Sequence, residues 1–509
     1  MFSKAKLSSF IVLLLFVCFF NGCKTNFLPG QDTSSSTAQN QTSSAAPPPA
    51  PIVVDGVRAS YSDVVEKTSP AVVRIDAEHK SNPAASVQRS PFLDDPQFRD
   101  FFRNMPQQPQ QQRPQIQRGV GSGVIVSADG TILTNFHVVD GSEKIVVTMN
   151  NNDSFPAKIV GSDQASDLAV LKIEGENLPF LNLGNSDNVR IGDIVLAIGN
   201  PLGIGQTVTA GIISAKGRRT GLSDGGSFED FLQTDAPINQ GNSGGALVNL
   251  NGELIGINSQ ILSNSQGGGN IGIGFSIPSN MAKSVMEQLV ENGQVRRGML
   301  GVGIQPITQA LAENFNVKDK KGVLINDVKK GSAAEKAGIQ RDDVIVAING
   351  EKIEDPNTLR NKVAGTLPGT EIKVTVLRDG ENKEFTVKLD ELETNKAQKS
   401  ESKEDKNDTD NSSENGKLGL SLQPATPEIL KQLGVPTDTK GLVVTEVDPN
   451  GAAAAEGISR GDVILEINRK PVGTIEDVQS ALEKSGDRSV LLLLNRRGQT
   501  IYLTIAPGK

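Results

Sequence analysis

The chain has 509 residues, of which 37% are hydrophobic, and this is enough for about three domains of ordinary size. Its net charge of -8 and its lack of a basic run exclude nucleic acid as the main partner, because phosphate binding needs clustered lysine and arginine. Both cysteines, Cys18 and Cys23, lie near the N-terminus and the only histidines are His79 and His137. This composition excludes a disulfide framework and most transition-metal sites, so no metal and no cofactor are expected.

The first 22 residues are typical of a secretion signal. Lys4 and Lys6 form a short positive region, and the apolar run that follows, Phe10 to Phe20, is too short to span a membrane comfortably. We therefore expect the protein to be exported to the periplasm or cell envelope.

The apolar run ends in Phe20-Asn21-Gly22-Cys23, which resembles the cleavage box of bacterial lipoproteins. This predicts that Cys23 is lipidated and anchors the chain to a membrane, although Phe20 stands where leucine is usual. The alternative is an ordinary signal with an incidental cysteine. Residues 23–56, rich in Ser, Thr, Gln and Pro, have too few large apolar side chains to fold and are expected to be a disordered tether.

A domain of short strands is expected at residues 57–292. Regular β-branched runs separated by Gly, Asn and Asp indicate a sandwich or barrel. These runs are Val72–Ile75, Val124–Val126, Ile145–Thr148, Leu168–Ile173, Val195–Ile198, Thr207–Ile213, Leu254–Ile257 and Ile271–Ile277. The domain is predicted to close with a helix that is capped by Ser279, has an apolar face of Met281, Val285 and Leu289, and stops at Gly293.

The segment Gly241-Asn242-Ser243-Gly244-Gly245 has the pattern of a nucleophile loop. Glycines beside a serine let the backbone turn tightly and bring its N–H groups close to a substrate carbonyl. The alternative is a hairpin turn before a strand at Ala246–Leu250. A serine nucleophile needs a base, and of the two histidines the better candidate is His137, just past a strand.

Four motifs in this order resemble the HtrA (high-temperature-requirement A, or Deg) family of serine proteases. They are Gly121-Ser122-Gly123-Val124-Ile125, Thr134-Asn135-Phe136-His137-Val138-Val139, Ser166-Asp167-Leu168-Ala169-Val170-Leu171 and Gly241-Asn242-Ser243-Gly244-Gly245-Ala246-Leu247. The resemblance implies a mainly β chain with a chymotrypsin-like pair of β-barrels. It also implies a catalytic triad, which falls here on His137, Asp167 and Ser243.

The chemistry of such a triad follows from the residue types. Imidazole, with an ordinary pKa near ~6.5, suits the task of taking the proton of Ser243, and a carboxylate fixes its tautomer. The family position assigns that carboxylate to Asp167, whereas the residues alone leave open the rivals Asp140, Asp153 and Asp163. The oxyanion is expected to be held by the backbone N–H groups of Gly241 and Ser243.

By resemblance, an apolar substrate pocket falls on Ile238, Ile261 and Leu262, with the alternative that these are core residues. Three loops are predicted to be regulatory: the long Gln- and Pro-rich insertion at residues 80–118, Gly199–Gln206 and Ser259–Gly269. Within the insertion, an aromatic stripe is expected to dock on a neighbouring subunit or to pack on its own domain: Phe98, Phe101 and Phe102.

The C-terminal part is an internal duplication, because Gly322–Leu359 and Gly441–Val478 align at a constant offset of 119 positions. Each copy resembles a PDZ domain, with expected bounds of 294–392 and 416–507 and a charged linker at 393–415. A PDZ domain binds a peptide terminus by strand addition and backbone N–H groups. The candidate loops are Gly298-Met299-Leu300-Gly301-Val302 and Lys417-Leu418-Gly419-Leu420. The alternative is that one copy, more plausibly the second, only scaffolds assembly.

Together these features predict an ATP-independent serine endopeptidase that captures unfolded or damaged proteins through its PDZ domains and cuts them. The resemblance further implies a homo-trimer, with higher assemblies and a chaperone activity as additional possibilities. Two alternatives are a peptide-binding chaperone or adaptor without catalysis, and an esterase that uses the same triad.

Overall fold

The computed structural model describes residues 53–54, 57–80, 116–200, 205–220, 226–239, 241–261, 270–318, 320–393, 418–486 and 488–506. Several sequence predictions lie outside these ranges. They are the export signal with Cys23, the tether up to residue 52, the three phenylalanines of the insertion, Leu262, the linker from residue 394 and Lys417. Among the described helices, none has the length and apolar character needed to cross a membrane.

Six of the described strands close into a first β-barrel. In sheet order they are β3 (Val72–Lys80), β4 (Ile116–Ile125), β5 (Thr131–Thr134), β8 (Leu168–Lys172), β7 (Ser154–Asp163) and β6 (Lys144–Thr148). All pairings are antiparallel, and the barrel buries a core of β-branched and leucine side chains. Ahead of it lie β1 (Val53–Val54), β2 (Val57–Arg58), α1 (Ser62–Thr68) and η1 (Ser69–Ala71).

A second barrel follows, and it too is closed by six strands of the described part. Their order is β10 (Thr207–Arg218), β11 (Phe231–Thr234), β14 (Gly274–Pro278), β13 (Leu254–Ile261), β12 (Ala246–Asn249) and β9 (Ile194–Gly199). The short helical segments of the two barrels are α4 (Phe136–Val139), η3 (Gln164–Ser166) and η4 (Ser186–Asn188). Each predicted β-branched run therefore overlaps a strand, as expected for a double barrel, although Val126, Ile173 and residues 271–273 lie just outside the strands.

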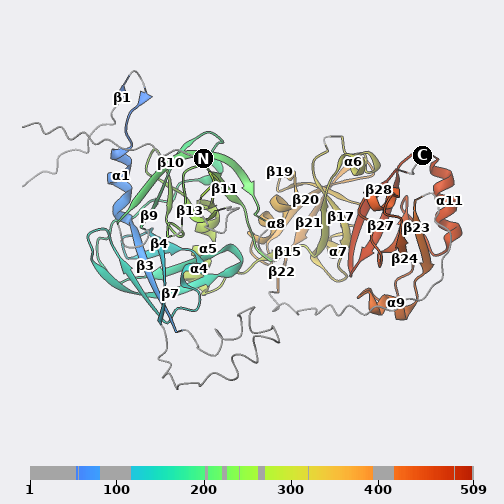
Figure 1. Ribbon diagram of the computed structural model, residues 1–509, viewed down its shortest axis with the longest axis horizontal. Coiled ribbons are helices and arrows are strands. Elements are labelled where there is room, and N and C mark those ends of the chain that lie inside the picture. Colours follow the sequence, from blue (N-terminus) through green and yellow to red (C-terminus); the bar gives the residue numbers. More distant parts are fainter. Residues whose placement is uncertain are drawn as a thin grey trace, which may run out of the picture. The chain divides into compact units, whose positions relative to one another are not determined.

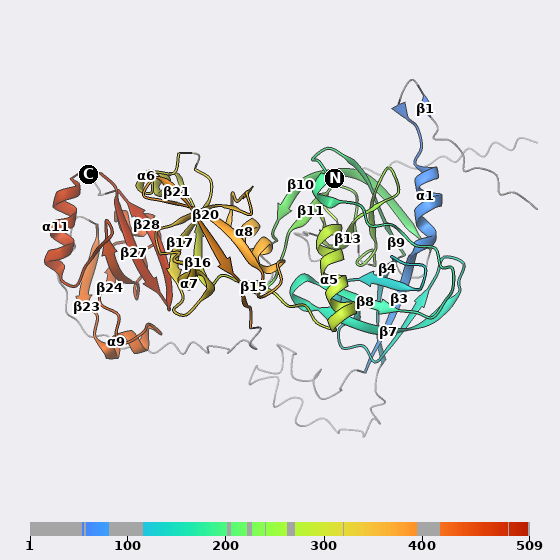
Figure 2. The ribbon, with the colours of Figure 1, turned by 180° about the vertical axis from the view of Figure 1, so that it is seen from behind.

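Helix α5 (Ser279–Asn292) bridges the two barrels, because it packs on β7 and β8 of the first and on β13 and β14 of the second (Figure 2). Its buried positions include Val285 and Leu289, and it ends at Gly293 with φ 70, as predicted. The predicted cap is wrong: the N-cap residue is Pro278, and Ser279 begins the helix. The Ser279 hydroxyl instead donates to the carbonyl of Gly184 at 2.7 Å, a distant partner that a local capping rule does not anticipate.

Two loop predictions also need correction. The insertion predicted at 80–118 is shorter at both ends, because Lys80 ends β3 and Ile116 begins β4, and the two residues pair with each other. The loop predicted at Ser259–Gly269 starts later, because β13 continues to Ile261. Strand pairing with the adjacent β14 extends β13 into a segment whose composition alone indicates a turn.

The two C-terminal modules repeat one sheet topology, shown from yellow to red in Figure 1. The first contains β15 (Gly298–Met299), β16 (Val302–Pro306), α6 (Gln309–Asn314), β17 (Val323–Val328), α7 (Ala333–Ala337), β18 (Val344–Ile348), β19 (Glu351–Lys352), α8 (Pro356–Ala364), β20 (Glu371–Arg378), β21 (Glu381–Lys388) and β22 (Asp390–Glu391). The second contains β23 (Leu420–Pro424), α9 (Pro427–Gln432), β24 (Leu442–Val447), α10 (Ala452–Ala455), β25 (Val463–Ile467), β26 (Lys470–Pro471), α11 (Ile475–Ser485), β27 (Val490–Arg496) and β28 (Gln499–Ile505).

Ion pairs between an arginine and a buried aspartate repeat between the modules as well. Arg378 binds Asp343 through two nitrogens and also donates to a glycine carbonyl, and Arg496 does the same with Asp462. Both aspartates are almost fully buried. The duplication seen in the sequence is therefore a duplication of tertiary contacts.

Candidate active site

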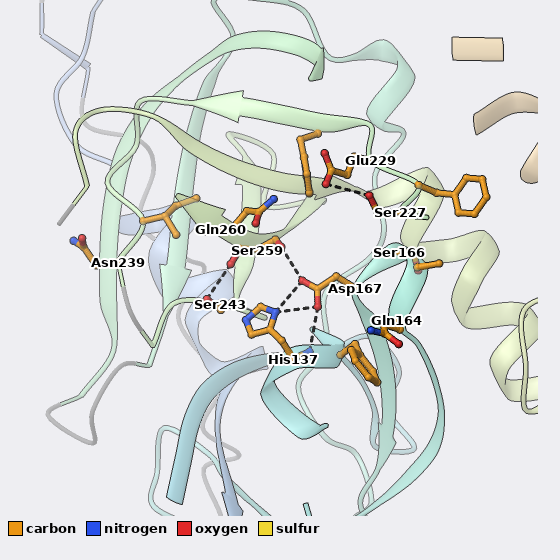
Figure 3. Close-up of a pocket in the computed structure, with 15 residues that line it drawn as sticks. His137, Gln164, Ser166, Asp167, Ser227, Glu229, Asn239, Ser243, Ser259 and Gln260 are labelled. Atoms are coloured by element: carbon orange, nitrogen blue, oxygen red, sulfur yellow. Dashed lines mark hydrogen bonds and ion pairs between the residues drawn. The ribbon is translucent and has the colours of Figure 1, made fainter. Parts of the chain in front are cut away.

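A pocket of about 680 Å³ lies where the two barrels face each other (Figure 3). The first barrel contributes His137 from α4 and Asp167 from the turn before β8, and the second contributes Ser243 and Ser259. The structure therefore brings the three residues of the predicted triad into one cavity, from segments far apart in the chain.

Asp167 is held by its backbone in an unusual conformation. It follows η3 with φ 54 and ψ 42, in the left-handed region that few residues other than glycine adopt. Its carbonyl accepts hydrogen bonds from Phe136 N at 3.2 Å and from Asn135 Nδ2 at 3.0 Å, so the turn is tied to the start of α4. Left-handed backbone at a non-glycine residue is common in functional turns, where the surrounding structure imposes it.

The side chain of Asp167 is directed at His137. Both carboxylate oxygens lie 2.9 Å from Nδ1 of the imidazole, and Oδ1 also accepts from the His137 backbone N–H at 3.1 Å. This arrangement fixes the imidazole so that Nδ1 is the protonated nitrogen and Nε2 is free to act as a base. Among the rival carboxylates, Asp163 is engaged elsewhere, in a buried ion pair with Arg297.

Ser259 connects the carboxylate to the serine. Its hydroxyl donates to Asp167 Oδ2 at 2.9 Å, and its carbonyl accepts from Ser243 Oγ at 3.0 Å. The His137 ring lies beside Ser243 in Figure 3, but the hydrogen bond that the serine hydroxyl makes in this structure is the one to Ser259. Catalytic hydrogen bonds are often incomplete in unliganded sites and form when substrate binds.

The predicted nucleophile loop precedes β12 and needs its glycines. Gly241 and Gly244 have φ values of 95 and 83. At Gly244 an added Cβ would lie 2.1 Å from the carbonyl oxygen of Ser122, so a side chain there has no room. The carbonyl of Ser243 accepts from Ser122 N at 2.8 Å, which secures the loop to the first barrel.

The chain matches the trypsin-like peptidase domain family over residues 121–257, and PDZ domain families over 298–389 and 443–496. A Chlamydia trachomatis protein named "Probable periplasmic serine endoprotease DegP-like" is 44% identical over 452 residues, covering 86% of this chain and 87% of the relative. A Haemophilus influenzae protein named "Probable periplasmic serine protease do/HhoA-like" is 42% identical over 454 residues, covering 88% and 91%.

The chain belongs to the HtrA family of serine endoproteases. Solved structures agree. The HtrA-type protease AlgW with a tripeptide is 40% identical with a TM-score of 0.53, and AlgW with a decapeptide is 43% identical with a TM-score of 0.50. These likenesses cover 66% of this chain and 98% and 100% of the solved chains. The predicted fold class, a chymotrypsin-like double barrel followed by two PDZ domains, is confirmed.

The substrate pocket of this HtrA protein is described only in part. Ile238 lines the pocket and is 1% exposed, with its side chain also packed in the core of the second barrel. Ile261 ends β13, but its side chain and all of Leu262 lie outside the described residues. Ile238 is therefore both a pocket residue and a core residue, so the two alternatives from the sequence do not exclude each other. The assignment of substrate specificity stays a prediction.

The candidate peptide-binding loop of the first PDZ domain runs from β15 to β16. Leu300 is buried in the domain core, and its carbonyl accepts from Ala334 N at 3.0 Å. Gly301, with φ 76, accepts from Lys329 N at 2.9 Å. Gly298 and Met299 form β15, and Val302 begins β16.

The second PDZ domain repeats these bonds. Leu418 is buried and accepts from Ala453 N, and Gly419, with φ 71, accepts from Asp448 N at 2.8 Å. Leu420 begins β23. The backbone of the loop is thus built alike in both domains.

The sequence does not assign roles to Ser122, Ser259 or Arg297, and it offers Asp163 only as a rival to Asp167. The sequence indicates only a loop at Ser259 and a glycine-rich motif around Ser122. The available signal was weak: a polar residue between two glycines in a strand, and an arginine at a domain boundary. Their partners lie far away in the sequence, so only the folded barrels reveal them.

Proposed function

We propose that this HtrA protein hydrolyses peptide bonds by acyl transfer, with Ser243 as nucleophile and His137 as general base. Asp167 orients the imidazole and stabilises its protonated form. The observation that carries this assignment is the double contact of the Asp167 carboxylate with His137 Nδ1 in the same pocket as Ser243. A buried hydroxyl, Ser259, supports the carboxylate from the other side.

The first chemical step follows from these positions. The Ser243 hydroxyl leaves the Ser259 carbonyl, passes its proton to His137 Nε2 and attacks the substrate carbonyl. The oxygen of the tetrahedral intermediate then takes up negative charge and is bound by the backbone N–H groups of Gly241 and Ser243. His137 returns the proton to the leaving amine, and water releases the acyl group in a second round.

Degradation of a denatured protein tests the assignment. Wild type and Ser243→Ala are compared with Ser142→Ala, which changes a half-buried serine after α4 whose hydroxyl donates to the carbonyl of Val139. We expect Ser243→Ala to abolish cleavage and Ser142→Ala to retain it. Equal cleavage by wild type and Ser243→Ala would exclude Ser243 as nucleophile. Suppression of aggregation by the inactive variant would support an additional chaperone activity.

We further propose that the PDZ domains bind the termini of unfolded or damaged proteins and deliver them to the protease domain. Strand β16 lies at an edge of its sheet, paired with β17 on one side only, and α8 belongs to the same domain. An extended peptide can add to such an edge with its terminal carboxylate at the loop before it. Competition between a peptide with a free C-terminus and its amidated form tests this, and equal binding of both would contradict it.

The proposed setting is the periplasm, in line with the names of the relatives, with the chain anchored through a lipid on Cys23 and assembled as a trimer. If Cys23 is acylated, Cys23→Ala protein should move from the detergent phase to the aqueous phase on phase partitioning. Light scattering tests the trimer, and a strict monomer would contradict it.

A further inference from the structure

Ser122 is a buried serine whose hydrogen bonds join four separate segments of the protease domain. It lies in β4, and its side chain is fully enclosed, with 0% exposure. At this position β4 pairs with β3, whereas its pairing with β5 is confined to Val124 and Ile125. The second edge of β4 at Ser122 is therefore open to the nucleophile loop.

The nucleophile loop is bonded to Ser122 at two points. Ser122 N donates to the carbonyl of Ser243 at 2.8 Å, and Ser122 Oγ donates to the carbonyl of Gly241 at 2.7 Å. Gly241 has φ 95, a conformation that glycine enters and leaves freely because it has no Cβ. The hydroxyl of Ser122 is thus a side-chain contact that restrains a left-handed glycine of the loop.

The other bonds of Ser122 reach the residue after β9 and the strand that precedes His137. Its Oγ accepts from the backbone N–H of Asn200, the residue after β9, at 2.8 Å. Its carbonyl accepts from Thr134 Oγ1 at 2.7 Å, and Thr134 ends β5 three positions before His137. Because the hydroxyl accepts from one segment and donates to another, its removal would leave a buried N–H and a buried carbonyl without their partner.

We propose that Ser122 is a positioning residue of the oxyanion hole. Its hydroxyl, oriented by the Asn200 N–H, holds the Gly241 carbonyl and thereby the direction of the amide donors at Gly241 and Ser243. An oxyanion hole works only when its donors point at the position that the charged oxygen will occupy. The proposal deepens, and rests on, the acyl-transfer mechanism proposed above.

A matched control exists in the same domain. Ser279 is likewise a buried serine, 1% exposed, whose hydroxyl donates to a backbone carbonyl, that of Gly184, at 2.7 Å. It makes this bond at the start of α5 and not in the active-site pocket. Ser279→Ala and Ser122→Ala therefore both remove a hydroxyl from an equally buried position. They differ in the backbone that the hydroxyl contacts, which is the nucleophile loop for Ser122 and Gly184 for Ser279.

The experiment measures hydrolysis of a fluorogenic peptide by the full chain, with rates expressed per active site titrated by a covalent serine reagent. For Ser122→Ala we expect kcat to fall about 10- to 100-fold, less than the about 100- to 1,000-fold typical of losing a donor outright, with KM nearly unchanged. The affinity for a peptide aldehyde, which forms a tetrahedral adduct, should weaken by the same factor as kcat/KM. Ser279→Ala should leave both kcat and the affinity for the peptide aldehyde unchanged.

Several outcomes would overturn the proposal. A kcat per active site for Ser122→Ala equal to that of Ser279→Ala would show that the hydroxyl serves stability only. A raised KM with unchanged kcat would show that it serves substrate binding instead. Because rates refer to titrated sites, a variant that folds only in part still gives a value. Full activity of Ser243→Ala, by contrast, would overturn the proposed mechanism itself.

Discussion

Arg297 and Asp163 form a buried, two-pronged ion pair between the start of the first PDZ domain and the turn that carries Asp167. The two guanidinium nitrogens lie 2.9 and 2.5 Å from the two carboxylate oxygens, and both side chains are at most 10% exposed. The same carboxylate caps η3 by accepting from Ser166 N at 2.9 Å. Ser166, the residue before Asp167, is thus hydrogen-bonded to the carboxylate that Arg297 binds.

Replacing Arg297 by methionine should strongly destabilise the chain, because it leaves the Asp163 charge buried without its partner. Breaking a buried pair typically costs about 3–5 kcal/mol. The neighbouring pair, Arg296 with Glu391, is half exposed on both sides, and water screens such a pair so that it contributes little to stability. Denaturant unfolding of Arg297→Met and Arg296→Met should show this difference. Equal losses would mean that the buried pair is not held as tightly as its geometry indicates.

Asp167→Asn should lower kcat by about 10⁴-fold with little change in KM, because an amide stabilises the wrong imidazole tautomer. Ser259→Ala should be milder, about 10-fold, since Asp167 keeps its contacts with His137. Steady-state kinetics with a peptide substrate measures both. A smaller effect of Asp167→Asn than of Ser259→Ala would contradict the role given to the carboxylate.

Asp230→Asn should raise thermal stability at pH 7. Burial, together with the nearby carboxylates of Asp187 and Asp355, raises the pKa of Asp230 from 3.8 to about 6, against a smaller opposing effect of Lys216. The folded chain therefore binds this proton more tightly than the unfolded chain does, and the stabilisation present below pH 3.8 is lost as pH rises through about 6.

The asparagine variant cannot lose that stabilisation, so its advantage in Tm over wild type should grow between pH 4 and pH 6. Asp129→Asn serves as a control of opposite sign, because Lys172 and Ser127 lower the pKa of Asp129. Its Tm deficit, small for an exposed group, should be largest at neutral pH. If the difference in Tm between Asp230→Asn and wild type did not change with pH, the raised pKa of Asp230 would be refuted.

Gly301→Ala should weaken peptide binding by the first PDZ domain about 10-fold or more. Gly301 has φ 76, and an added Cβ would lie 2.4 Å from the Cβ of Ser332, so the loop has to move. Gly350→Ala is the matched control, with φ 81 and nothing within 4 Å of the added Cβ. It should cost about 1 kcal/mol of stability through backbone strain alone and leave affinity unchanged. Fluorescence anisotropy with a labelled peptide distinguishes the two.

Local features of the chain were predictable where they depend on local physics. The β-branched runs overlap strands, to within one to three residues at their ends, because side-chain alternation and turn residues act within a few positions. Gly293 ends α5 because a left-handed residue is needed there. The cap assigned to Ser279 was wrong because its hydroxyl has a better partner in Gly184, which lies 95 positions away.

The sequence by itself determined the family, with the double barrel that it implies, the duplication of the PDZ domains, and the residue types available for catalysis. Only the tertiary structure decided how they are held. The contact of His137 with Asp167 spans 30 positions, that of Ser259 with Asp167 spans 92, and that of Ser122 with Gly241 spans 119. Such contacts depend on barrel closure and on the fit of loops between barrels, which no periodicity or local propensity encodes.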